Sequence, residues 1–151
     1  MVGIGYDSHR FADGRPLILG GVEIDHPRGL AGHSDADVLT HAVIDAILGA
    51  GGAGSDIGTM FPDDDEQWQG ADSIDLLRTV VGTIAGPIVN VDATLICEEP
   101  RLGPYKAEME RTLADATSAR VSVKATSNEG MGWIGRGEGI ACIAVASVQS
   151  E

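Results

Sequence analysis

The chain has 151 residues, and its 23 acidic against 10 basic side chains give a formal net charge of −13 at pH 7. This balance provides no basic patch, so we expect neither a nucleic acid nor an anionic membrane as a partner. With 43% hydrophobic and 22% charged residues, the composition is that of a folded chain, and the length predicts a single domain over residues 1–151.

The cysteine content and the apolar runs indicate a cytoplasmic protein. Cys97 and Cys142 both lie in apolar runs and are too few for a disulfide scaffold, which predicts two buried thiols. The first ten residues lack a basic stretch followed by an apolar run. The longest apolar run, Ile140–Val148, is far shorter than the roughly 20 residues that span a bilayer.

The first half of the chain predicts two strand regions and two helices. A short strand is expected over Met1–Tyr6, and Pro16–Ile24 predicts a strand pair or a bulged strand around its two central glycines. Apolar residues at helical spacing predict a helix over Ser34–Leu48 that begins with Ser34 as its N-cap. A loop over Gly49–Gly70 and a helix over Ser73–Ala85 follow.

The second half predicts strands around one further helix. Good alternation of apolar and polar residues indicates a strand over Pro87–Glu98, and Tyr105–Thr117 has helical spacing. Strands are expected over Arg120–Thr126 and Gly139–Val148, with a glycine-punctuated loop between them. The order of elements predicts an α/β (α+β) domain in which a single-layer β-sheet carries its helices on one face.

Three side chains form a candidate metal site. Asp7 and His9 are two positions apart on a strand, so both project to the same side. His41 belongs to a polar stripe with Asp37 and Asp45 on the predicted helix. Two imidazoles and one carboxylate suit zinc and leave a fourth position open. The residues alone equally allow a strand-end turn with a capping aspartate, and a hydrogen-bonded, half-buried histidine.

Three further segments contain groups that bind phosphate or cations. His33–Asp37 opens a predicted helix, whose free N–H groups suit a phosphate, although plain helix capping explains the same residues. Asp56–Gly58 and Phe61–Asp65 lie in a long loop, where the aspartates either bind Mg²⁺ or form a solvated turn. Thr126–Glu129 ends a strand with two hydroxyls and a carboxylate, which suit phosphate and metal, or an ordinary turn.

Taken jointly, seven segments resemble one family. In chain order they are GYDSHRF, ILGGVEI, GHSDADVLTHAVIDAILG, DIGTMFPDDD, GADS, EEPRLGPY and VKATSNEGMGWIGRGEGIACIAVA. They are similar to the 2-C-methyl-D-erythritol 2,4-cyclodiphosphate synthases of the non-mevalonate isoprenoid pathway. The resemblance implies a homotrimer of α/β subunits around a threefold axis, with active sites between subunits. It implies a lyase that cyclises 4-diphosphocytidyl-2-C-methyl-D-erythritol 2-phosphate with release of CMP.

The resemblance also implies particular site residues. Zinc would be held by Asp7, His9 and His41, and a second divalent cation, Mg²⁺ or Mn²⁺, by Glu129 together with the diphosphate. Catalytic roles are implied for His33 and Ser127. The implied substrate contacts are Asp7, Ser8, His9, His33, Ser34, Asp56, Ile57, Gly58, Phe61, Pro62, Asp63, Asp64, Asp65, Cys97, Glu98, Glu99, Pro100, Arg101, Leu102, Gly103, Thr126, Ser127, Asn128, Glu129, Trp133 and Arg136.

The chain departs from the family pattern at two of these loops. Ser127 stands where threonine is usual but keeps the hydroxyl, and Gly130 stands where lysine is common, which removes one expected phosphate contact. The stretch Gly49–Gly54 is about one residue longer than the common form.

The C-terminal strand carries a prediction about assembly. Ile140–Val148 is apolar on both faces, so one face needs cover beyond the helices, which threefold packing would supply. The resemblance implies an axial cavity lined by Arg136 and Glu138 and capped by Tyr6, which would take an isoprenoid diphosphate or hold a purely structural ion-pair ring. Two alternatives from other classes remain: a zinc phosphohydrolase, and a non-catalytic module that binds nucleotide or metal.

Overall fold

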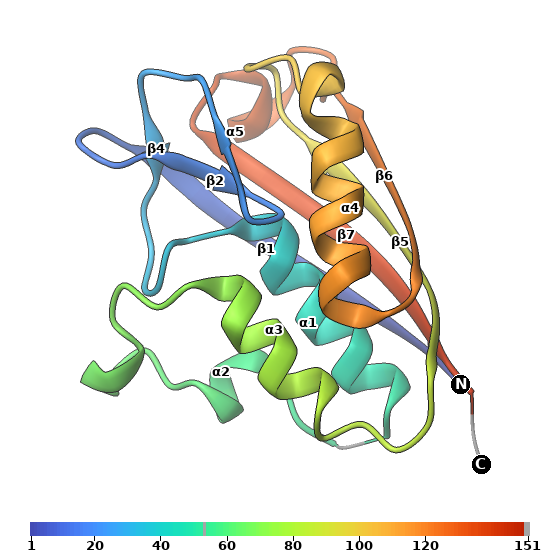
Figure 1. Cartoon of the computed structure of the whole chain (residues 1–151). Coiled ribbons are helices and arrows are strands. Elements are labelled where there is room, and N and C mark those ends of the chain that lie inside the picture. The colour runs from blue at the N-terminus through green and yellow to red at the C-terminus, as the bar shows by residue number, and fades with distance from the viewer. Residues whose placement is uncertain (53, 150–151) are drawn as a thin grey trace.

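Five strands form one mixed sheet in the order β4-β1-β7-β5-β6 (Figure 1). The computed structural model describes residues 1–52 and 54–149. β1, β7 and β5 are antiparallel neighbours, β4 pairs antiparallel with the end of β1, and β5 and β6 are parallel. The strands are β1 (Val2–Ala12), β4 (Gly29–Leu30), β5 (Ile88–Ile96), β6 (Arg120–Thr126) and β7 (Gly139–Val148).

Helices α1 (Val38–Ala50) and α4 (Lys106–Thr117) cover one face of this sheet, and α3 (Ser73–Val81) packs on these two helices (Figure 1). α1 packs on β1 and β7, and α4 packs on β6. The buried core lies between the helices and the sheet, and none of its members is a charged side chain. This agrees with the predicted α/β class and with helices on one face.

The contact between β1 and α1 is unusually close because glycines face the helix. A Cβ atom on Gly5 would lie 1.9 Å from the carbonyl oxygen of Ala42, and one on Gly3 would lie 2.1 Å from that of Ala46. Only glycine permits this approach of strand to helix backbone. The alternation of β1 then turns Val2, Ile4 and Tyr6 to the opposite, exposed face.

The predicted strand pair is present as β2 (Leu17–Leu19) and β3 (Val22–Ile24), which form a separate antiparallel ribbon. The prediction for the central helix was wrong at its start. α1 begins at Val38 with Asp37 as N-cap, whose side chain accepts a hydrogen bond from the Thr40 N–H. Ser34 instead has φ of +56°, outside helical geometry.

Asp37 is the cap because the β2–β3 turn completes its hydrogen bonding. Its carboxylate is fully buried and accepts from the N–H groups of Gly20 at 2.9 Å and Gly21 at 2.8 Å. It also accepts from the Thr40 N–H at 2.9 Å and from the Thr40 hydroxyl at 2.7 Å. Burial raises the pKa of this carboxyl, and the nearby Asp35 charge adds to the rise. Asp37 therefore joins the hairpin to the start of α1.

Other boundaries also differ from the sequence-based expectations. β1 continues six residues past the predicted end at Tyr6, and β4 was not predicted because two residues carry no alternation. The helix expected to reach Ala85 ends at Val81. Short helices occupy regions predicted as loops or as part of α4: α2 (Ile57–Met60), η1 (Glu66–Trp68), η2 (Gly103–Tyr105) and α5 (Gly132–Gly135).

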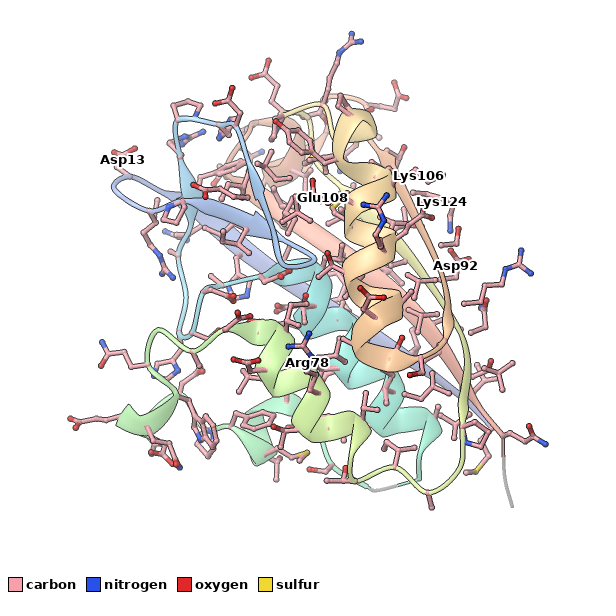
Figure 2. All side chains as sticks on the ribbon, viewed as in Figure 1. Asp13, Arg78, Asp92, Lys106, Glu108 and Lys124 are labelled. Atoms are coloured by element: carbon pink, nitrogen blue, oxygen red, sulfur yellow. The ribbon has the colours of Figure 1, made fainter. Side chains whose placement is uncertain are left out.

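Apart from buried Asp37, the Asp and Glu side chains and the Lys and Arg side chains of the described residues are exposed or half-buried. Lys124 of β6 forms an ion pair with Asp92 of β5, and Figure 2 shows the two side chains together on the outer side of these strands. Both are about half exposed, so the pair contributes less than about 1 kcal/mol. Among the described residues, none of the helices has the length and apolar character needed to cross a bilayer.

Candidate active site

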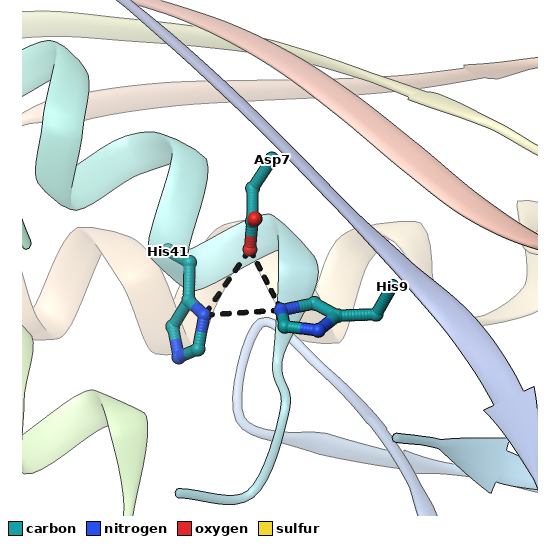
Figure 3. A group of neighbouring side chains, drawn as sticks. All are labelled: Asp7, His9 and His41. Atoms are coloured by element: carbon teal, nitrogen blue, oxygen red, sulfur yellow. Dashed lines mark hydrogen bonds and ion pairs between the residues drawn. The ribbon is translucent and has the colours of Figure 1, made fainter. Parts of the chain in front are cut away.

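Asp7, His9 and His41 converge on one point between β1 and α1 (Figure 3). The Asp7 Oδ2 atom lies 2.8 Å from His9 Nε2 and 3.1 Å from His41 Nδ1, and the two ring nitrogens are 3.3 Å apart. The same-side projection of Asp7 and His9 is therefore confirmed. Within residues 1–52 and 54–149, this is the one group of three or more His, Cys, Asp or Glu side chains placed to share a metal ion.

The three atoms fit one tetrahedral ion. Nitrogen and oxygen ligands at about 2.0–2.2 Å from zinc lie roughly 3.4 Å from each other in a tetrahedron. The observed separations of 2.8, 3.1 and 3.3 Å are close to this value, and small outward rotations of the side chains would match it. A three-ligand site of this kind leaves the fourth position to a phosphate oxygen or water.

The electrostatics of the group favour a carboxylate beside an imidazolium when no metal is bound. Burial alone raises the pKa of Asp7, but hydrogen bonds from His41 and His9 and their charges outweigh it and lower the pKa to about 2. Burial alone lowers the pKa of His41, yet the hydrogen bond to Asp7 and the charges of three aspartates raise it above its usual value. A divalent cation would replace the proton that the two side chains share.

Each histidine has a second hydrogen bond on its outer nitrogen. His9 Nδ1 donates to the Ala31 carbonyl oxygen at 2.9 Å. His41 Nε2 lies 2.9 Å from the Ser73 hydroxyl and 3.1 Å from the Ser34 hydroxyl. Such partners fix the orientation of metal-binding imidazoles.

The three side chains line a cavity of about 310 Å³. Several predicted substrate residues share its lining, namely His33, Ser34, Ile57, Gly58, Phe61 and Asp63. Gly32, Trp68 and Leu76 also line it and were missed by the sequence-based reasoning. Trp68 packs edge-on against Phe61, with ring centroids 4.9 Å apart, and so forms one wall.

The segment that carries His33 and Ser34 is fixed from outside by Arg15. The guanidinium donates to the carbonyl oxygens of Gly32 at 2.7 Å and Ser34 at 2.9 Å, on either side of His33. These two hydrogen bonds hold the segment in its left-handed turn at Ser34. Arg15 was not predicted to have a role.

Two of the predicted acidic substrate residues serve as helix caps. Asp56 accepts from the Thr59 N–H at 2.7 Å at the start of α2, and Asp65 accepts from the Gln67 N–H at 3.1 Å at the start of η1. Neither residue lines the metal-site cavity, and nor do Pro62 and Asp64. The acidic loop is therefore ordered by its own carboxylates, and Asp63 is the one that reaches the cavity.

A second cluster of predicted substrate residues lies at the carboxyl ends of β5 and β6. A cavity of about 500 Å³ is lined by Cys97, Glu98, Pro100, Arg101, Leu102, Gly103, Pro104, Ala125, Thr126 and Ser127. Glu98 joins its two sides, because its carboxylate accepts from the N–H groups of Asn128 at 2.9 Å and Gly130 at 3.2 Å. Glu129 lies in that turn with an exposed side chain and a φ of +54°. This cavity shares no lining residue with the metal-site cavity.

Three more of the predicted residues line a third and larger cavity of about 690 Å³, whereas Glu99, Asn128 and Glu129 line none of the three cavities. The lining of this larger cavity includes Ser8, Trp133 and Arg136, together with Arg10 and Arg28, which the sequence-based reasoning did not select. Arg136 Nε donates to the Glu138 carboxylate at 2.7 Å, and both side chains are more than half exposed. The convergence of half-buried Asp7 and His9 with buried His41, rather than cavity size, marks the smaller cavity as the candidate reaction centre.

The fold and site define an α/β protein in which three side chains that line a cavity are placed to share a metal ion. Residues 1–149 match the YgbB family, and the chain belongs to that family. It is 54% identical to the 2-C-methyl-D-erythritol 2,4-cyclodiphosphate synthase of Symbiobacterium thermophilum, over 98% of both chains. It is 55% identical to the enzyme of that name from Salinibacter ruber, over 99% of this chain and 98% of the other.

Solved structures agree with these relatives. A structure of 2C-methyl-D-erythritol-2,4-cyclodiphosphate synthase in a CDP-bound form superimposes with a TM-score of 0.87 at 32% identity, covering 99% of this chain and 100% of that one. The bifunctional IspDF of Campylobacter jejuni gives a TM-score of 0.90 at 40% identity, covering 96% of this chain and 41% of that one.

Proposed function

We propose that this chain, as one domain over residues 1–151, cyclises 4-diphosphocytidyl-2-C-methyl-D-erythritol 2-phosphate to 2-C-methyl-D-erythritol 2,4-cyclodiphosphate and releases CMP. The observation that carries this function is the convergence of Asp7, His9 and His41 at the cavity that contains His33 and Ser34. The identity of more than half over nearly the full length of named synthases supports the same reaction.

The reaction forms one phosphorus–oxygen bond and breaks another within a single molecule. An oxygen of the 2-phosphate attacks the β-phosphorus, and the bond from that phosphorus to the oxygen of the CMP phosphate breaks. A phosphate monoester has a second pKa of about 6, so the nucleophile is already largely ionised near pH 7 and needs no strong base. The protein must chiefly hold two anionic groups together, and such positioning supplies up to roughly 7–11 kcal/mol.

The residues of the two cavities divide this work. His33 and the Ser34 hydroxyl, which line the same cavity as Asp7, His9 and His41, would donate hydrogen bonds to a phosphate. Ile57, Gly58 and Phe61 would contact the erythritol part, and the lining from Cys97 to Gly103 would take the cytidine. Ser127 and Thr126 would donate to the diphosphate.

Two cations complete the proposed site. Asp7, His9 and His41 would hold zinc, and Glu129 would hold Mg²⁺ or Mn²⁺ together with diphosphate oxygens. When bound, these ions supply positive charge that reduces repulsion between phosphates in a protein of net charge −13. The exposed carboxylate of Glu129 suits a cation that binds mainly with the substrate.

We propose a homotrimer because one subunit leaves both an apolar face and an incomplete site. Val2, Ile4 and Tyr6 of β1 are 70%, 71% and 56% exposed, and they neighbour the exposed Ile143 and Val145 of β7 across the strand pair. Threefold packing of these faces would bury them and bring the nucleotide cavity of one subunit against the metal-site cavity of the next. A monomer in sedimentation at micromolar concentration would contradict this arrangement.

The same packing would place Arg136 and Glu138 around the axis, with Tyr6 as the cap. We propose that this ring binds the diphosphate of an isoprenoid, whose tail enters the apolar interior. Titration with a prenyl diphosphate should give weaker binding to Arg136→Met than to the unaltered protein. Equal affinity would leave the Arg136–Glu138 pair, at 2.7 Å, a structural contact only. The cytoplasmic location likewise stays a prediction.

The reaction itself is tested with substrate in ¹⁸O-labelled water. The cyclase is expected to give CMP and a cyclic diphosphate, neither of which contains solvent oxygen. A zinc phosphohydrolase at the same site would give linear products that carry the label. Binding of CMP and zinc without turnover would indicate a non-catalytic module.

A further inference from the structure

Ser73, the first residue of α3, lies behind His41 on the side away from the other two metal ligands. Its hydroxyl oxygen is 2.9 Å from His41 Nε2, and the residue is fully buried. The two positions are 32 residues apart in the chain, so the packing of α3 against α1 creates this contact.

Asp35 determines which way the Ser73 hydroxyl points. The Ser73 hydroxyl donates to one carboxylate oxygen of Asp35, and the Ser73 N–H donates to the other at 3.0 Å. Asp35 is itself held by the Asp37 N–H at 3.2 Å and by its own N–H, which donates to the Ala71 carbonyl oxygen at 3.1 Å. The carboxylate therefore takes both donors that Ser73 has.

The hydrogen bond from the Ser73 hydroxyl to Asp35 determines the tautomer of His41. A serine hydroxyl has one proton, and that of Ser73 is given to Asp35, so its oxygen can only accept from the imidazole. The Nε2 atom must then carry a proton in either charge state, so that in the neutral ring the lone pair of Nδ1 points at Asp7 and His9. A metal ion requires this unprotonated nitrogen.

We propose that Ser73 and Asp35 are positioning residues that hold His41 in the tautomer and ring orientation that binds metal. This inference rests on the proposed metal site. Metal-binding histidines generally give their other N–H to a carboxylate, carbonyl or water, and loss of that partner costs about 10–100-fold in metal affinity. Here a serine hydroxyl lies between the carboxylate and the imidazole.

The arrangement separates the roles of two serines beside the same nitrogen. Ser34 lies slightly farther from His41 Nε2, at 3.1 Å, and it lines the metal-site cavity, which Ser73 does not. Because the Nε2 proton is given to Ser73, the Ser34 hydroxyl keeps its own proton for a ligand in the cavity. Ser73 therefore supports metal affinity, whereas the Ser34 hydroxyl can donate a hydrogen bond to an anionic ligand in the cavity.

The test compares zinc affinity among Ser73→Ala, Asp35→Asn, Ser34→Ala and, as a matched control on β6, Ser122→Ala. Competition with a chelator should give a zinc dissociation constant about 10–100-fold higher for Ser73→Ala. Asp35→Asn should weaken zinc binding less, because the amide keeps one acceptor oxygen. Ser34→Ala and Ser122→Ala should stay within about threefold of the unaltered protein.

A second readout reports the tautomer directly. Nitrogen-15 NMR of the zinc-loaded protein should show a slowly exchanging His41 Nε2–H that is lost in Ser73→Ala and kept in Ser122→Ala. If the unaltered protein binds no zinc, the proposed metal site is wrong. If it binds zinc and folded Ser73→Ala keeps both the affinity and the Nε2–H signal, the positioning role is overturned. Should Ser73→Ala not fold, unchanged zinc affinity and Nε2–H signal in Asp35→Asn overturn it equally.

Discussion

The close approach of β1 to α1 predicts that alanine at position 5 damages both stability and the metal site. A Cβ atom there would lie 1.9 Å from the Ala42 carbonyl oxygen and 2.8 Å from the Ala46 nitrogen, whereas real Cβ contacts essentially never fall below 3.0 Å. The strand and helix would have to separate by about 1 Å. Because both neighbours are helix backbone, no side-chain rotation can relieve the clash.

The expected loss of stability follows from this displacement of strand and helix. Overpacking of a core costs about 1–3 kcal/mol, and we expect Gly5→Ala to be near the upper end because backbone must move. Asp7 lies two residues along β1, and His41 precedes Ala42 on α1. Their contact of 3.1 Å would lengthen beyond the roughly 3.4 Å that a tetrahedral zinc allows. Zinc affinity should therefore fall by at least about tenfold.

Gly49→Ala is the matched control on the other side of the same contact. Its Cβ atom would lie 3.5 Å from the nearest atom, the Cα of Gly3, which is an ordinary contact. Since Gly49 lies within α1, alanine should stabilise the protein by about 0.5–1 kcal/mol. Urea unfolding with EDTA and chelator competition for zinc would measure both effects. Equal stability changes in the two variants, or unchanged zinc affinity in Gly5→Ala, would refute the reasoning.

Three further predictions concern the supports of the site. Asp37→Ala leaves several buried donors unpaired and should lower the free energy of unfolding in urea by about 4 kcal/mol. The control Asp72→Ala removes an exposed helix cap and should lower it by about 1 kcal/mol, so similar losses in the two variants would contradict the prediction. Arg15→Met removes two hydrogen bonds from the loop before α1, so KM should rise roughly tenfold at unchanged zinc content. An unchanged KM would contradict the proposed support of the His33–Ser34 segment by Arg15. In metal-free protein, the Asp7 carboxylate gives its full stabilisation of the fold above its unfolded pKa of 3.8, and this stabilisation is lost as pH falls toward its folded pKa of about 2. The His41 imidazolium gives its full stabilisation below its unfolded pKa of 6.5, and this is lost as pH rises through its raised folded pKa. Unfolding free energies should thus show a larger loss for His41→Gln at about pH 5.5 than at about pH 9, and equal losses would contradict the pairing.

Local pattern was enough to predict most elements and the common face of Asp7 and His9, whereas the family resemblance was needed to select these two and His41 as metal ligands. Asp7 and His9 share a face because a strand alternates, and the apolar spacing around His41 marks a helix whatever packs on it. The strand pair around Gly20–Gly21 was likewise predictable, because the two glycines interrupt an apolar run. These features depend on neighbours within a few residues.

The features that local pattern missed depend on tertiary partners. Ser34 and Asp37 are equally good N-cap residues by type, but two N–H groups from the β2–β3 turn make Asp37 the cap. Ser73 and Asp35 are 38 residues apart, and no spacing in the sequence connects them. The division of the predicted substrate residues among separate cavities also follows only from the fold, and the individual substrate contacts stay predictions.

Phosphorus NMR of the purified, zinc-loaded protein with 4-diphosphocytidyl-2-C-methyl-D-erythritol 2-phosphate and Mg²⁺ tests the proposed reaction most directly. The monoester signal should disappear while two coupled signals of a cyclic diphosphate and the signal of CMP grow in equal amounts. His41→Ala, measured in parallel, should leave the substrate spectrum unchanged. Inorganic phosphate or a linear diphosphate as the product of the unaltered protein, or no conversion at all, would contradict the cyclase assignment.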